Sequence, residues 1–323
     1  MNNGSEVEVP FGFVVIDKPA GLTSHACVNR LRRVFGIKRV GHGGTLDPAV
    51  TGVLPIALGS ATRLLPYLPG SKTYRGLIQM GLQTSTDDLQ GEVIQQNPWP
   101  DLEQQTLEQI LDDFRGSIEQ RPPQVSAVHI DGERAYVRAR RGETPKLPLR
   151  SVTIHELQLL HWDSKQGQLE LRVHCSSGTY IRSLARDLGE RLNCGGCLAH
   201  LRRLQALGFE EQQAIPLPER ERPSDQPRPE VLAPLTALEH LPRVEINEQE
   251  AALWSCGQQL TIQPERCLPA PHTERNTGQT ADHSQQFSSS TPMVVIDQTS
   301  TVVGIGSLES IEQLKPKVVF NAV

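Results

Sequence analysis

Hydrophobic and polar residues repeat with two different periods along the chain, and these periods predict both helices and strands. Apolar residues at helical spacing follow Ser24, the expected N-cap, and stop at Gly36. A second helix is expected from Thr106, its N-cap, to Phe114, just before Gly116. Apolar runs predict strands at residues 13–16, 53–58, 72–80, 152–162 and 169–175, and a third helix is expected at 180–192. The mixture predicts an α/β protein of the α+β type.

The last third of the chain has a different composition and predicts a second, smaller domain. Residues 218–233 are rich in Pro, Glu and Arg, which is typical of a connector. Beyond it we expect a helix at 248–255 and strands at 294–297 and 302–307. Residues 262–292 are rich in Thr, Ser, Gln, Pro and His, which predicts a disordered insertion. We therefore expect one domain over residues 10–241 and another over 242–323.

A Pro- and Arg-rich segment at residues 120–150 has little apolar periodicity. Long polar segments inside a domain are usually functional or disordered. The net charge of the chain is −5, yet residues 129–150 hold six basic against three acidic residues. Residues 218–323 carry 8 Lys+Arg and 14 Asp+Glu, so the acidic excess lies in the tail. Local positive patches set the attraction to phosphates; the alternative for this segment is a solvated surface of salt bridges.

Composition favours a folded intracellular protein with room for two domains. The chain has 323 residues, of which 37% are hydrophobic and 21% charged. No apolar run approaches the roughly 18 residues that span a membrane, and the polar N-terminus lacks a signal-peptide pattern. We therefore expect a cytoplasmic protein without a membrane partner.

The six cysteines do not predict a disulfide framework, which also fits the cytoplasm. Cys194 and Cys197 have the spacing of a metal knuckle. A zinc site needs about four ligands, and the chain has no second pair of this kind. We expect no metal, and interpret the pair as part of a turn between a helix and a strand.

The candidate chemistry lies in the stretch Gly-His-Gly-Gly-Thr-Leu-Asp-Pro at residues 41–48. Its three glycines and one proline predict a tight, unusual turn, and the turn presents a single carboxylate, Asp47. Without a second acid nearby, Asp47 is a candidate nucleophile or electrostatic anchor. The alternative is an Asx turn, in which the carboxylate only bonds its own loop. A phosphate-binding loop is disfavoured, because neither a G-x-G-x-x-G spacing nor a Lys-Ser/Thr follows the glycines.

Several motifs, in this order, resemble the TruB family of bacterial tRNA pseudouridine synthases. They are FVVIDKPAGLTS (13–24), GHGGTLDP (41–48), TGVLPIALG (51–59), KTY (72–74), RPP with SA (121–127), SGTYIR (177–182) and LRRL (201–204). The resemblance covers roughly residues 10–241. It implies a mixed, largely antiparallel sheet with a central cleft. It also implies an RNA-binding thumb-like insertion at 120–150 and a small C-terminal PUA-like β domain at 242–323.

The resemblance further implies an activity. Family members flip the T-loop uridine of tRNA (position 55) out of the stack and isomerise it to pseudouridine. They act on the T-arm of free tRNA, without a guide RNA. We expect no cofactor, because the reaction is a redox-neutral isomerisation with no external group transferred. We expect a monomer that requires no protein partner.

By its match to the family motifs, Asp47 is the expected nucleophile and Arg182 its counter-charge. Tyr180 is the expected base that takes the C5 proton, although a packing role is an alternative. A phenol with a pKa near 10 is a poor base at pH 7 unless its surroundings help.

The resemblance also assigns four substrate-binding residues. His42 is expected to wedge into the gap that the flipped bases leave, and Leu201 to lie beneath the base. Tyr74 offers an aromatic face for the flipped uracil, a contact worth on the order of 1–3 kcal/mol; the alternative is a half-buried strand residue. Lys18 is expected to make a phosphate or a structural contact.

Two other functions compete with this hypothesis. One is a tRNA-binding folding factor whose isomerase activity is secondary or lost, and the other is a pseudouridine synthase with a different RNA target. The exchange of Asp47 for Asn separates the enzyme from the pure binder, because only the enzyme needs the carboxylate.

Overall fold

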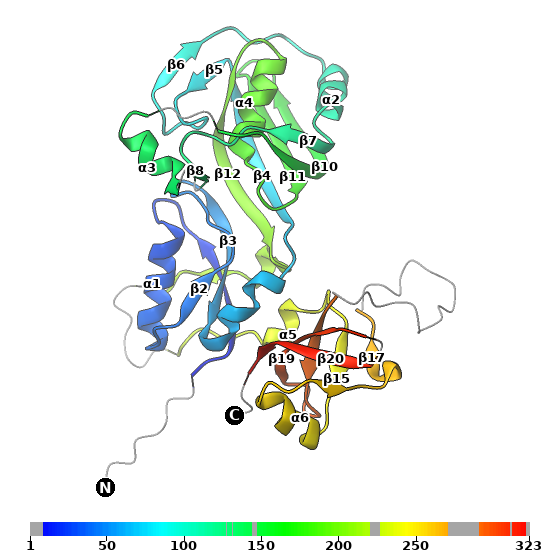
Figure 1. Cartoon of the computed structure of the whole chain (residues 1–323). Coiled ribbons are helices and arrows are strands. Elements are labelled where there is room, and N and C mark those ends of the chain that lie inside the picture. Colours follow the sequence, from blue (N-terminus) through cyan, green and yellow to red (C-terminus); the bar gives the residue numbers. More distant parts are fainter. Residues whose placement is uncertain are drawn as a thin grey trace.

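In the described part of the chain, most strands of the larger domain lie in one ten-stranded sheet (Figure 1). Two short pairs, β5 (Leu82–Thr84) with β6 (Val93–Gln96) and β8 (His129–Ile130) with β9 (Glu133–Arg134), lie outside it. The computed structural model describes residues 9–126, 128–130, 132–143, 147–219, 227–270, 291–310 and 312–320. The strands of this sheet are β1 (Gly12–Lys18), β2 (Val40–His42), β3 (Thr51–Leu58), β4 (Lys72–Met80), β7 (Gly116–Gln120), β10 (Arg150–Asp163), β11 (Gln168–Cys175), β12 (Gly196–Ala206), β13 (Phe209–Glu210) and β14 (Ile215–Pro216).

The order of the strands places two halves of the sheet on either side of β12. The order is β14-β1-β3-β12-β4-β11-β10-β7, with β2 beside β3 and β13 beside β12. Among the described strands of this sheet only the pairs β1–β14 and β3–β12 are parallel. The sheet is therefore mixed and largely antiparallel, which confirms the predicted fold class. The long strand β12 belongs to both halves, so residues at its middle lie between them (Figure 1).

Helices cover the two halves of the sheet. These are α1 (Ser24–Phe35), the 3-10 helix η1 (Gly59–Tyr67), α2 (Gln104–Asp112) and α4 (Ile181–Arg191). Helix α1 lies on the half that contains β3, and α4 on the half that contains β4 (Figure 1). The apolar stripes predicted from the periodicity are buried in one core, including Leu31 on α1, Leu107 on α2 and Leu184 on α4.

Two predicted helix starts are wrong, and for α1 the reason is a side-chain contact. The N-cap of α1 is Thr23, whose hydroxyl accepts from Ala26 N at 3.1 Å. Ser24 instead exchanges two hydrogen bonds with the backbone of Leu46, at 2.9 and 3.2 Å. Helix α2 begins at Gln104 rather than after Thr106, as further polar residues extend its first turn. The predicted end of α1 at Gly36 is confirmed.

The 120–150 segment has more structure than its periodicity predicted. It contains β8 (His129–Ile130), β9 (Glu133–Arg134) and α3 (Ala135–Arg140). Three buried residues far apart along it, Val128, Ala135 and Leu147, form a small apolar cluster. Part of its basic charge is paired, since Glu133 binds Arg138 and Arg141. For Arg138 and Arg141, the alternative of a salt-bridged surface is therefore confirmed. Lys146 lies outside the described residues.

The C-terminal part forms a separate six-stranded sheet with the order β16-β20-β19-β18-β15-β17. Its elements are α5 (Pro234–Ala237), β15 (Arg243–Glu245), α6 (Glu248–Ser255), β16 (Leu260–Thr261), the 3-10 helix η3 (Pro264–Arg266), β17 (Cys267–Leu268), β18 (Pro292–Ile296), β19 (Val302–Leu308) and β20 (Gln313–Val319). The predicted helix at 248–255 and both predicted strands are confirmed. Of the insertion predicted at 262–292, residues 271–290 lie outside the described residues.

The small domain packs against the half of the sheet that contains β1 (Figure 1). One apolar cluster contains residues of both parts, including Phe13, Phe209, Val294 and Phe320. The rings of Phe11 and Phe320 are 4.7 Å apart, and Arg63 covers the Phe320 ring. Within the described ranges, no helix is long and apolar enough to cross a membrane.

Candidate active site

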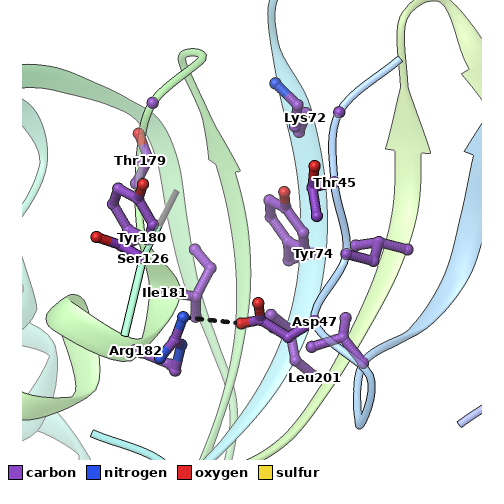
Figure 2. Close-up of a pocket in the computed structure, with 14 residues that line it drawn as sticks. Thr45, Asp47, Lys72, Tyr74, Ser126, Thr179, Tyr180, Ile181, Arg182 and Leu201 are labelled. Carbon is purple, nitrogen blue, oxygen red and sulfur yellow. Dashed lines mark ion pairs between the residues drawn. The ribbon is translucent and has the colours of Figure 1, made fainter. Parts of the chain in front are cut away.

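A cavity of about 260 Å³ opens at the junction of the two halves of the sheet. One wall comes from the loop between β2 and β3, together with Lys72 and Tyr74 on β4 (Figure 2). The opposite wall comes from Ser126 and from residues 178–182 at the start of α4. Strand pairing explains the arrangement, because Tyr74 lies opposite Arg203 and Gly76 lies opposite Leu201 in the β4–β12 register. Of the residues assigned from sequence, the cavity brings together Asp47, Tyr74, Tyr180, Arg182 and Leu201.

The loop that carries Asp47 is fixed from both sides of that residue. On one side, Ser24 holds the backbone of Leu46. On the other side, the carbonyl of Pro48 accepts from Gly21 N at 2.8 Å and from Lys18 Nζ at 3.1 Å. The Asp47 side chain is 46% exposed and reaches into the cavity. The backbone is thus held while the carboxylate stays accessible.

Lys18 makes structural contacts, one of the two alternatives expected for it, and it is not among the residues that line the cavity. It is fully buried, and its ammonium also donates to the carbonyls of Pro19 at 2.8 Å and Leu22 at 2.7 Å. Three carbonyls therefore use its three protons. Burial lowers the pKa of Lys18.

Arg203 holds the next part of the loop from β12. It is fully buried and donates to Val53 O at 2.7 Å and Gly44 O at 3.1 Å. A Cβ at Gly52 would lie 2.2 Å from the carbonyl oxygen of Arg203, and Gly52 has φ +102°. Only glycine permits this approach between β3 and β12.

Arg182 forms an ion pair with Asp47 across the cavity, with 2.9 Å between Nη2 and Oδ2 (Figure 2). Its side chain is only 7% exposed. The guanidinium also donates to Thr86 O at 3.1 Å and Val125 O at 2.9 Å, and Asp88 lies 3.7 Å away. These contacts fix the direction of the cation, so Arg182 can orient the carboxylate without itself moving.

Tyr180 is held at the N-terminus of α4. The amide side chain of Gln120 bonds both its N–H, at 2.8 Å, and its carbonyl, at 3.1 Å. Its ring packs on the small cluster of the 120–150 segment. Burial raises the pKa of Tyr180, against the smaller effects of the charges of Arg150 and Arg182. Its role as a base stays a prediction.

Tyr74 is buried and lines the cavity from the opposite wall. Burial raises its pKa as well, and the charge of the buried Arg203, which lies opposite Tyr74 in the β4–β12 register, acts in the other direction. A neighbouring cation stabilises a phenolate. Leu201 also lines the cavity, and its place beneath the base stays a prediction.

His42 ends β2 and is not among the residues that line the cavity. It is half-buried, and burial lowers its pKa, followed by the charges of Arg203 and His25. Its role as a wedge stays a prediction.

Two residues that line the cavity, Lys72 and Ser126, lie within quoted motifs but were given no role from the sequence. Arg203, in the LRRL motif, supports the loop from β12. The neighbouring Arg202 is bound to Asp17 and Glu211, so it is a structural residue. In the part of the chain that the structure describes, no three His, Cys, Asp or Glu side chains gather in a way that could hold a metal ion.

A basic surface adjoins the site on the α1 side. Residues 19–46 contain no Asp or Glu but hold Arg30, Arg32, Arg33, Lys38 and Arg39. Arg33, Lys38 and Arg39 are exposed, and none of the five is in an ion pair within the described ranges. Strand β2 leads from this surface directly to the loop of Asp47. A surface of this charge attracts phosphates.

The family model described as "TruB family pseudouridylate synthase (N terminal domain)" matches residues 32–181 of this chain. The chain is 61% identical to tRNA pseudouridine synthase B of Prochlorococcus marinus (strain MIT 9313), over 97% of this chain and 99% of that one. It is also 61% identical to the protein of that name from Parasynechococcus marenigrum (strain WH8102), over 97% and 98% of the two chains.

Two solved structures share the fold. A chain of a Cbf5-Nop10-Gar1 complex is 25% identical, with a TM-score of 0.69 over 96% of this chain and 84% of that one. A chain of an H/ACA RNP bound to a substrate RNA containing 2'-deoxyuridine is 23% identical, with a TM-score of 0.68 over 96% and 85%.

Proposed function

The chain belongs to the TruB family of pseudouridine synthases, and from this premise we propose that it isomerises uridine 55 in the T-loop of tRNA to pseudouridine. The relatives named tRNA pseudouridine synthase B support the substrate. The observation that carries the proposal is the ion pair of an accessible Asp47 with a buried, fixed Arg182 in the cavity.

The reaction breaks the N1–C1′ bond of uridine and forms a C5–C1′ bond. C5 loses a proton, N1 gains one, and no electron or external group is transferred. The chemistry therefore requires no cofactor. The nucleotide must leave the helical stack before any side chain can reach it.

We assign the nucleophile to Asp47. A carboxylate nucleophile divides the difficult exchange of bonds into two easier steps through a covalent intermediate. Arg182 holds the carboxylate at 2.9 Å and supplies the positive charge that the site needs as charge develops on the detached base.

We propose that Tyr74, rather than Tyr180, takes the C5 proton. Tyr74 lies opposite the fully buried Arg203 in the β4–β12 register, and the charge of Arg203 acts against the burial that raises the pKa of Tyr74. A buried neighbouring cation favours the phenolate form that a base requires. Tyr180 then serves as a wall of the cavity.

Replacement of each tyrosine by Phe separates these roles. We expect Tyr74→Phe to lower kcat by about 10²-fold or more, because the base is lost. Tyr180→Phe should lower kcat by less than about tenfold, because the ring that forms a wall of the cavity is kept. Release of tritium from tRNA labelled at C5 of uridine measures the step. The opposite order of the two effects would return the role of base to Tyr180.

The test of the whole proposal is pseudouridine mapping on an unmodified tRNA transcript with the purified protein alone. Conversion of the T-loop uridine only, without added RNA or protein, is the expected result. Conversion at other uridines would indicate a different RNA target. Tight tRNA binding without conversion would favour the folding factor, and conversion only with an added guide RNA would overturn the stand-alone activity.

The basic surface beside α1 should contribute to tRNA affinity and not to chemistry. The triple variant Arg33→Ala, Lys38→Ala and Arg39→Ala should raise KM and leave kcat within about twofold. If all three contact phosphates, the slope of log Kd against log salt should fall by about 2 to 3. Arg191→Ala is the matched control, because that exposed cation is already paired with Asp113. An unchanged slope in the triple variant would show that tRNA does not reach this surface.

A further inference from the structure

Helix α4 carries a second arginine, Arg186, one turn after Arg182. Arg186 makes contacts of the same type as those of Arg182. Arg182 approaches Asp88 and donates to the carbonyl of Val125. Arg186 binds Asp87 at 2.8 Å and donates to the carbonyl of Arg121 at 2.8 Å. Residues four apart lie on the same face of a helix. Two consecutive aspartates and two nearby carbonyls therefore face two arginines on one helix face.

Both arginines hold the same two segments of the chain. The first, residues 85–91, connects β5 (Leu82–Thr84) to β6 (Val93–Gln96), and the second, residues 121–126, follows β7. Besides Asp47, every partner of Arg182 described above belongs to one of these two segments. The orientation of the Arg182 guanidinium therefore depends on where these two segments lie.

The 85–91 segment has an unusual backbone at the point where Arg186 binds it. Asp87 has φ +61°, a left-handed conformation that is uncommon for a residue with a side chain. The carbonyl of Asp87 accepts from Leu198 N at 2.9 Å, and Leu89 N donates to the carbonyl of Leu198 at 3.1 Å. The segment is thus held between β12 on one side and α4 on the other. A conformation of this kind persists only where its surroundings hold it.

The Arg186–Asp87 pair is largely removed from water, with side-chain exposures of 21% and 16%. Burial raises the pKa of Asp87, and Arg186 acts against that shift. Buried pairs contribute little net stability, but loss of one partner leaves an unpaired buried charge. The pair is therefore better suited to holding one conformation than to stabilising the fold. Ser183 donates to the same Arg121 carbonyl at 2.8 Å, which fixes this carbonyl from two sides.

We propose that Arg186 is a positioning residue of the active site. With Asp87 and the Arg121 carbonyl it holds the 85–91 and 121–126 segments against α4, and these segments direct the Arg182 guanidinium toward Asp47. The inference rests on the proposed function, because its readout is the isomerisation. Arg186 itself does not line the cavity and does not touch the substrate.

The test is a set of kinetic variants on full-length protein and tRNA transcript. Arg186→Gln should lower kcat by about 10- to 100-fold and change KM by less than about threefold, because a small displacement of Arg182 affects the chemical step more than tRNA binding. Asp87→Asn should lower kcat in the same direction but by less, because Arg186 keeps its ion pair with Asp187 at 2.8 Å and its bond to the Arg121 carbonyl. The double variant should be no worse than Arg186→Gln alone, since that variant already removes the Arg186–Asp87 pair. Arg191→Gln, on the same helix and paired with Asp113 at the surface, should match the wild type.

A role that is merely structural would not depend on Arg182. We therefore expect Arg186→Gln to have little further effect on kcat in an Arg182→Lys background. The same fold-loss in both backgrounds would overturn the proposal, as would an Arg186→Gln variant with unchanged kcat. If Arg186→Gln does not fold, Arg186→Lys replaces it, because lysine keeps a positive charge opposite Asp87. An equal loss of kcat for Arg186→Lys in the wild-type and the Arg182→Lys backgrounds would then overturn the proposal. Inactive wild type would mark failure of the proposed function instead.

Discussion

Replacement of Asp47 by Asn is expected to abolish pseudouridine formation, lowering kcat by about 10⁴-fold or more, while tRNA affinity stays within a few-fold. Asn has the shape of Asp but lacks the nucleophilic carboxylate. The loop should keep its conformation, because Leu46 and Pro48 are held through their backbones and not through the Asp47 side chain. Single-turnover conversion of a tRNA transcript, measured beside a binding titration, tests both halves of the expectation.

Asp17→Asn is the matched control, because this partly exposed carboxylate pairs with Arg202 outside the cavity. It should keep kcat near that of the wild type. If Asp47→Asn converted uridine at a rate near that of the wild type, Asp47 would be an anchor of its own loop and the nucleophile would have to be sought elsewhere. A loss of binding equal to the loss of turnover would also contradict the assignment.

Arg182→Lys is expected to have the second largest effect, a fall in kcat of about 10²- to 10³-fold with a small change in KM. The planar guanidinium bonds Asp47, Thr86 O and Val125 O at once, whereas a lysine ammonium is a point charge on a flexible stem. The carboxylate would keep a cation nearby but lose its fixed direction. Steady-state and single-turnover kinetics on the same tRNA transcript separate kcat from KM.

Arg182→Leu should also lower the stability of the fold, by about 3–5 kcal/mol, because Asp88 would remain without its buried partner. Thermal unfolding measures this loss. Arg75→Lys is the control, since that exposed arginine binds Glu170 in the same planar manner on the surface. A rise in KM alone for Arg182→Lys would mean that Arg182 binds tRNA and does not orient Asp47.

Long, strongly periodic elements could be predicted from the sequence. The stripes of α1 and α4 and the apolar runs of β3, β4 and β11 are visible locally, because one buried face imposes its period on the residues. The N-cap of α1 was not predictable, since Thr23 and Ser24 are equally good caps. The contact of Ser24 with Leu46, 22 residues away, decides between them.

Elements whose apolar residues are few and far apart in sequence could not be predicted. In the 120–150 segment, Val128, Ala135 and Leu147 form a cluster only once the chain has folded back on itself. In the small domain, β16 and β17 have two residues each, and β20 contains Pro316 and two lysines. Such segments become strands because they form backbone hydrogen bonds with the edge of a neighbouring strand. The local sequence pattern does not indicate this pairing.

For the site, the sequence by itself determined the tight Asp47 loop and, through resemblance, a set of residues that meet in one cavity. Only the tertiary structure decided what each residue touches. It placed Lys18 under the loop, set Arg203 opposite Tyr74 across β12 and β4, and brought Arg182 to Asp47. The physical reason is that local spacing sets backbone conformation, whereas these contacts depend on the pairing of β3, β12 and β4, whose order and register arise from packing of the whole sheet.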